Sequence, residues 1–185
     1  MEKRGKSSSK SILFIVFLVF SIWVLLQFLT PLMLPKNSVK DLSGSVGVSD
    51  NENVIKKIGL PWDFVYHCGD ILCHQKSERS FFINGNQMPF CARCTAIWLG
   101  LAIGVGFMLF YKIEFNEKFF VFMILAIIPM GVDGVGQLFG LWVSTNIVRL
   151  LTGLSAGIVC GIVIGQVLDE VAIFFSEKLN SKKYR

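Results

Sequence analysis

The chain has 185 residues, of which 53% are hydrophobic and 17% are charged, with a formal net charge of +5. This composition is too apolar for an ordinary soluble domain, and it indicates a protein of the lipid bilayer. The length is that of one domain.

Four apolar stretches reach the roughly 20 residues that a helix needs to cross the hydrocarbon core. They cover residues 11–34, 92–111, 119–138 and 147–168. Because backbone amides must find partners within lipid, we predict an all-α membrane protein with four transmembrane helices. The first stretch is expected to be an uncleaved anchor, since it is longer than a signal-peptide core and Pro35 follows it instead of a small-residue cleavage site.

The basic residues near the helix ends predict the orientation. They lie before the first helix, between the second and third, and after the fourth, whereas residues 139–146 contain none. The positive-inside rule therefore places both termini in the cytoplasm, with the protein in the plasma membrane. The net charge reflects this topology and indicates no nucleic-acid partner.

The composition divides the chain into four parts. Residues 1–34 are expected to form a cytoplasmic tail and anchor, and residues 35–60 a flexible linker. Residues 61–175 would hold a Cys/His-rich extracytoplasmic loop and a three-helix membrane core, with a basic cytoplasmic tail at 176–185. Within the loop, Pro61 begins a predicted interfacial helix. Asn84-Gly85 predicts a hairpin that would bring Cys91 back toward Cys73.

This loop holds four of the five cysteines and both histidines of the chain: His67, Cys68, Cys73, His74, Cys91 and Cys94. Such crowding suggests one shared site, for which three interpretations are open. In the first, the C-x-x-C pair joins a second pair, Cys73 with His74 or with Cys68, to bind zinc in tetrahedral geometry.

In the second interpretation, Cys91 and Cys94 cycle as a redox pair. A helix N-terminus and Arg93 would both lower their pKa values. The architecture is similar to that of the quinone-coupled disulfide-forming proteins of bacterial membranes. In the third, the cysteines form structural disulfides, which an oxidising outer face permits. Cys160, in the last helix, is expected to be an inert buried thiol.

Polar residues within the apolar stretches predict a second site. Asp133 and Gln137 share a helix face, and we predict that Arg149 is the partner of Asp133. With Asn146, these residues form either a structural ion pair or a pocket for a ligand such as a lipid or a quinone. Candidate catalytic residues are Asp133, Arg149 and Glu78, which is either a general base beside a metal-bound water or a solvated loop charge.

Four motifs together resemble a family of small polytopic membrane proteins of bacteria and archaea without an assigned function. They are CHQ-x-x-ERSF from Cys73, CARCT from Cys91, DG-x-x-Q-x-x-G from Asp133 and STN-x-x-R-x-x-TG from Ser144. The resemblance spans about residues 61–157. Two positions depart from the family pattern: Ala96 replaces glycine, and Trp142 replaces an arginine, which removes a positive charge from the pocket.

The resemblance implies that one set of residues acts together: Cys73, His74, Arg79, Cys91, Arg93, Cys94, Asp133, Gln137, Asn146 and Arg149. It favours Cys73, His74, Cys91 and Cys94 as the zinc ligands, above a pocket formed by the others. The leading hypothesis is thus an extracytoplasmic zinc-type site over a polar intramembrane pocket. A thiol-disulfide oxidoreductase and a small transporter or channel subunit are the alternatives.

Overall fold

Four long helices form the membrane part of the computed structural model, which describes residues 2–113 and 115–183. They are α1 (Glu2–Met33), α4 (Ala92–Phe110), α5 (Glu117–Leu138) and α6 (Asn146–Lys183). Each contains a segment long and apolar enough to cross a bilayer: Ser9–Met33, Ala92–Phe110, Glu117–Leu138 and Asn146–Phe175. The prediction of four transmembrane helices is confirmed.

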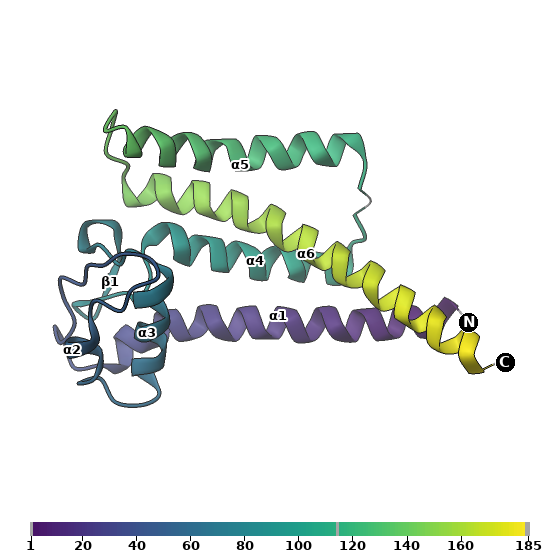
Figure 1. Cartoon of the computed structure of the whole chain (residues 1–185), viewed down its shortest axis with the longest axis horizontal. Helices are drawn as coiled ribbons and strands as arrows, with labels where there is room; N and C mark the ends of the chain where they lie inside the picture. Colours follow the sequence, from purple (N-terminus) through teal and green to yellow (C-terminus); the bar gives the residue numbers. More distant parts are fainter. Residues whose placement is uncertain (1, 114, 184–185) are drawn as a thin grey trace.

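The helices lie side by side, and both ends of the chain are at the same end of the bundle (Figure 1). Helix α6 packs along α4, while α1 contacts both α4 and α6. Helix α5 lies at the edge and is held mainly by α6. The 38 residues of α6 would span about 57 Å at the helical rise of ~1.5 Å per residue, so α6 exceeds the ~30 Å hydrocarbon core and crosses the bundle obliquely.

Glycines allow the backbones of α4 and α6 to touch. A Cβ atom on Gly157 would lie 2.4 Å from the carbonyl oxygen of Ile97, and one on Gly100 would lie 2.6 Å from the backbone nitrogen of Ile158. One turn further along α6, a Cβ on Gly161 would lie 2.5 Å from the carbonyl oxygen of Leu101. Small residues at four-residue spacing permit such close approach of helices in lipid.

The segment between α1 and α4 forms a small folded region at the end of the bundle away from the termini (Figure 1). We call it the outer region. It contains α2 (Glu52–Ile55), α3 (Trp62–Leu72), the 3₁₀ turn η1 (Ser77–Arg79), and the antiparallel strands β1 (Phe82–Ile83) and β2 (Asn86–Gln87). Asn84 and Gly85 connect the strands with φ angles of 54° and 72°, the left-handed values of a tight hairpin turn. The predicted Asn-Gly hairpin is confirmed.

Residues 35–60, which the sequence predicts to be a flexible linker, contain several buried side chains. Val39 and Leu42 are buried in a cluster with Leu34, Ile55, Ile58 and Tyr66. The Asn86 side chain fixes the start of this segment, because its Oδ1 accepts hydrogen bonds from the backbone nitrogens of Ser38 (2.7 Å) and Val39 (3.0 Å). Its Nδ2 donates to the carbonyl oxygen of Pro31 at the end of α1 (2.9 Å). The segment is thus anchored at isolated positions that show no periodic pattern.

Candidate functional site

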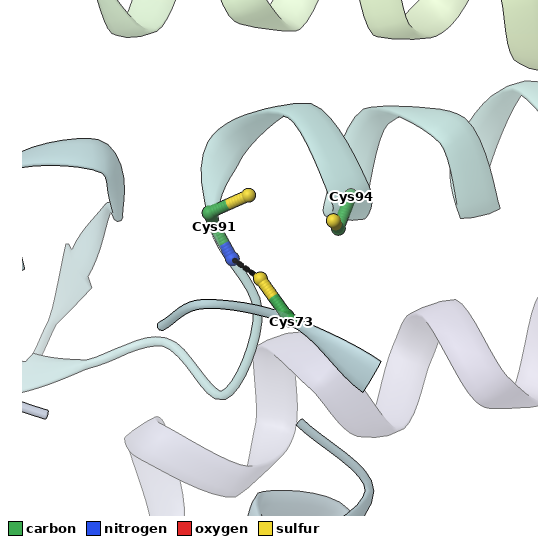
Figure 2. A group of neighbouring side chains, drawn as sticks. All are labelled: Cys73, Cys91 and Cys94. Carbon is green, nitrogen blue, oxygen red and sulfur yellow. Dashed lines mark hydrogen bonds between the residues drawn. The ribbon is translucent and has the colours of Figure 1, made fainter. Parts of the chain in front are cut away.

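Three cysteines from two separate segments converge on one point, and we call them the thiol triad: Cys73, Cys91 and Cys94. Cys73 directly follows α3, Cys91 directly precedes α4, and Cys94 lies in the first turn of α4. Their sulfur atoms all lie within 4.8 Å of one another (Figure 2). The backbone nitrogen of Cys91 donates a hydrogen bond to the Cys73 sulfur at 3.3 Å.

Buried side chains with amide and hydroxyl groups bring the two segments together. Gln75 Nε2 donates to the carbonyl oxygen of Pro89 (2.7 Å), and Gln87 Nε2 donates to the carbonyl oxygen of Gln75 (2.5 Å). The Tyr66 hydroxyl donates to the carbonyl oxygen of Gln87 (2.5 Å), and burial raises the pKa of Tyr66. Gly69 permits the approach, since a Cβ there would lie 1.9 Å from the Pro89 carbonyl oxygen. Tyr66, Gly69 and Gln87 could not be identified from the sequence, because no periodic pattern marks them, and Gln75 was visible only as part of the CHQ motif.

The thiols of the triad influence one another. Hydrogen bonds with the Cys73 and Cys94 thiols lower the pKa of Cys91. The hydrogen bond with Cys91 raises the pKa of Cys73 to about 11, so the thiols of the triad do not ionise alike. Cys68 lies on α3 outside the triad, and burial raises the pKa of its thiol. The pKa of Cys91 is thus lowered, while those of Cys73 and Cys68 are raised.

The histidines lie apart from this group. His74 and His67 are both exposed, and neither belongs to the ligand group found among the described residues. The backbone at Cys73 is extended, with φ of −143° and ψ of 148°. Consecutive side chains point to opposite sides of an extended chain, so a buried Cys73 is followed by an exposed His74. The structure thus brings together three of the four predicted ligands.

A second group, the polar cluster, lies between α4, α5 and α6. It consists of Arg93, Asp133, Gln137, Trp142, Asn146 and Arg149. The Arg93 guanidinium forms an ion pair with buried Asp133, which also accepts hydrogen bonds from Gln137 Nε2 (3.0 Å) and Trp142 Nε1 (3.3 Å). The prediction that Arg149 is the partner of Asp133 is wrong, because Arg93 occupies that position and Gln137 intervenes.

Arg149 extends the cluster to the outer region. Its Nη2 donates to Gln137 Oε1 and its Nη1 to Asn146 Oδ1, both at 2.9 Å. Asn146 Nδ2 in turn donates to the carbonyl oxygen of Ser80 at 3.2 Å. Arg79 directly precedes Ser80 and is partly exposed. Its Nε atom lies 3.7 Å from Oε1 of the exposed Glu78.

Trp142 has a role that the sequence did not indicate. As a replacement for arginine, it removes a positive charge from the predicted pocket. Its indole N–H is nevertheless a third donor to Asp133. Its ring lies over Gly136, where a Cβ atom would meet it at 2.1 Å.

Cys160 was predicted to be a buried thiol, but it is exposed on α6.

Helix α1 brings a further buried polar side chain to this end of the bundle. Gln27 is completely buried, and neither polar atom of its amide has a partner among the described residues. One turn earlier, Trp23 packs against Phe90 and Trp98, with ring centroids 5.9 and 6.0 Å apart. Because Phe90 directly precedes Cys91, this packing sets the outer half of α1 against the start of α4.

Comparisons with known proteins agree with this architecture. A family described as "Predicted membrane protein (DUF2085)" matches residues 73–163, a range that includes the thiol triad and the polar cluster. An uncharacterised protein of Methanocaldococcus jannaschii is 40% identical over 104 residues, which cover 52% of this chain and 65% of that protein. The match thus covers slightly less than two thirds of that relative.

An uncharacterised protein of Methanothermobacter thermautotrophicus is 37% identical over 87 residues, which cover 47% of this chain and 78% of that protein. No solved structure matches the chain. The four membrane-spanning helices, the matched range and the coverage of this second relative lead to one conclusion: the chain belongs to the DUF2085 family of membrane proteins.

Proposed function

We propose that the protein binds a zinc ion through the thiol triad at the outer face of the plasma membrane. The observation that carries the proposal is the convergence of three sulfur atoms within 4.8 Å of one another. Zinc bound by thiolates at ~2.3 Å in tetrahedral geometry requires sulfur atoms about 3.8 Å apart. Small side-chain adjustments would reach that spacing.

The number of thiols favours a metal over a disulfide. A disulfide joins two sulfur atoms at about 2.05 Å, and it would leave the third thiol of the triad without a role. A metal ion binds all three sulfur atoms. It also stabilises their thiolate forms, whose like charges would otherwise repel one another at this spacing. Soft thiolate ligands select zinc over hard ions such as magnesium or calcium.

Three protein ligands leave a fourth coordination position for water or a small ligand, the arrangement typical of catalytic rather than structural zinc sites. A zinc ion in such a site activates a bound water or polarises a ligand that replaces it. The triad therefore supports a reactive or ligand-exchanging site in the outer region.

The proposed orientation rests on the basic residues at the opposite end of the molecule. Lys10 precedes the apolar part of α1, and Lys112 and Lys118 flank the connection from α4 to α5. Basic residues at this end indicate the cytoplasm. The outer region and the thiol triad would then face outward.

Metal analysis of the purified full chain tests the proposal. After incubation with zinc and removal of the excess, elemental mass spectrometry should find about one zinc ion per chain, because one triad supplies one tetrahedral site. Replacement of Cys73, Cys91 or Cys94 with serine should remove most of the bound zinc.

The chain contains its own matched controls, because Cys68 and Cys160 lie outside the triad. Cys68→Ser and Cys160→Ser should retain the zinc, and circular dichroism should show equal helical content in all five variants. Equal loss of zinc from triad and control variants would contradict the proposal. So would a metal-free wild-type protein whose thiols oxidise reversibly in a redox buffer, a result that would support an oxidoreductase.

A further inference from the structure

Arg149 is a buried cation whose contacts are all neutral. Only 3% of the residue is exposed, and its guanidinium nitrogens donate to the amide oxygens of Gln137 and Asn146. Among the described residues it forms no ion pair. Arginine remains charged in proteins, and a buried charge is costly unless an opposite charge lies nearby. Arg149 also lies in the first turn of α6, where the helix dipole opposes a positive charge.

Two further guanidinium groups lie close by. Arg79 and Arg93 both repel the charge of Arg149, and Asp133 and Cys91 offset part of that repulsion. The contact of Asn146 with the Ser80 carbonyl oxygen holds the Arg79 turn against the start of α6. In the part of the chain that the structure describes, Arg79 forms an ion pair only with Glu78, and this pair uses its Nε atom at 3.7 Å. Among the described residues, no hydrogen bond or ion pair is found for its terminal nitrogens, so they are available to a ligand.

The buried negative charge of the cluster is already committed. Asp133 accepts from Arg93, Gln137 and Trp142, which leaves no comparable contact for Arg149. The Nε atom of Arg93 is also buried without a partner among the described residues. This part of the molecule thus holds three guanidinium groups and one buried carboxylate, and the excess positive charge lies between η1 and the start of α6.

We propose that Arg79 and Arg149 bind a phosphate group at this place. Guanidinium groups bind phosphate oxygens through paired, charge-assisted hydrogen bonds, and two guanidinium groups match its charge. Asn146 and Gln137 orient Arg149 for this contact in advance. The position, at the outer end of a membrane-spanning helix, is the depth at which phospholipid headgroups lie. The phosphate can therefore come from an anionic lipid or from a soluble compound.

This phosphate site does not depend on the proposed zinc ion, since none of its residues belongs to the thiol triad. The two proposals can fail separately. Cys91→Ser should abolish zinc binding and leave the response to phosphate unchanged. Arg79→Gln should retain the zinc and weaken the response to phosphate.

Thermal unfolding of the full chain in detergent tests the site in two arms. The first arm compares inorganic phosphate with chloride at equal ionic strength. The second compares mixed micelles that contain phosphatidylglycerol with micelles that contain only phosphatidylcholine. A ligand that binds the folded state raises the unfolding temperature. We expect a rise in at least one arm, and that arm identifies the source of the phosphate.

Two variants and one control decide the outcome. Arg79→Gln, at a partly exposed position, and Arg149→Gln should each weaken the apparent affinity by about tenfold or more, as the loss of a charge-assisted hydrogen bond predicts. Lys57→Gln changes an exposed charge of the outer region and should keep the wild-type response. The proposal is overturned if neither arm stabilises the wild-type protein, or if all three variants respond as the wild type does.

Discussion

Helix α6 packs against α4 and α5 in opposite ways. Toward α4, helix α6 presents glycines, and the backbones of the two helices touch over several turns. Toward α5 it presents side chains with polar groups: Gln137 of α5 accepts from Arg149, and the Ser155 hydroxyl donates to the carbonyl oxygen of Ala126 at 3.0 Å. The first contact depends on shape and the second on hydrogen bonds and charge.

This difference indicates how the two candidate sites are held. From the close packing of α4 and α6 we infer a rigid unit, which carries two cysteines of the thiol triad at one end, together with Arg93 and Arg149. Helix α5 attaches to that unit through the polar cluster, while much of its other surface is apolar and exposed, including Val121, Leu125 and Val132. Changes at the glycine contact should therefore affect both sites, and changes at the polar contact only one.

The largest effect is expected when the glycine contact is filled. In Gly157→Leu, the new Cβ would lie 2.4 Å from the Ile97 carbonyl oxygen, a backbone atom that cannot move aside. We expect the overpacked helices to separate, with loss of the folded protein and of zinc binding. Size-exclusion chromatography and zinc content measure both results.

Gly131→Leu is the matched control. A Cβ atom at Gly131, on α5, would meet nothing within 4 Å. This variant should elute and bind zinc as the wild type does. If both leucine variants behave alike, the α4–α6 contact is not the rigid unit that we infer.

An intermediate effect is expected at the polar contact. Asp133→Asn keeps the size of the side chain but removes the charge that pairs with Arg93, and it should cost about 2 kcal/mol of stability. Faster hydrogen exchange should be confined to the outer half of α5, and zinc content should remain that of the wild type. Asp63→Asn, in the outer region, is the control. Loss of zinc from Asp133→Asn would show that the thiol triad and the polar cluster form one site.

The smallest effect is expected for Trp142→Phe. Phenylalanine keeps an aromatic side chain at this position but lacks the N–H group that donates to Asp133 at 3.3 Å. The loss of one neutral donor to a charged acceptor should lower stability by about 1 kcal/mol. Chemical unfolding in detergent measures this change. A larger loss would mean that the ring itself, rather than its hydrogen bond, holds the end of α5.

The sequence predicted the helices and the hairpin because these depend on local patterns. Long apolar stretches define the spans, and Asn84-Gly85 selects a tight turn. The approach of Cys91 to Cys73 followed from that turn. The exposure of His74 could not be predicted in the same way, since it depends on the extended backbone at one residue, Cys73.

The partner of Asp133 was predicted wrongly for a related reason. A helical pattern shows which residues share a face, but it does not show which neighbouring helix lies opposite. Arg93 and Arg149 both lie near the outer ends of their helices, so both fit the carboxylate by depth. The burial of Val39 and Leu42 could not be predicted, because it comes from packing with Ile55, Ile58 and Tyr66 and follows no periodic pattern.

The four residues from Cys91 to Cys94 serve two sites through one turn of helix. Successive residues of a helix are rotated by about 100°, so Arg93 points away from Cys91 and toward α5, while Cys94 returns toward Cys73. One residue inserted or deleted directly after Cys91 would rotate Arg93 and Cys94 by that angle relative to Cys91. The arginine would leave Asp133, and the second cysteine would leave the triad. The length of this motif is therefore as restricted as its composition.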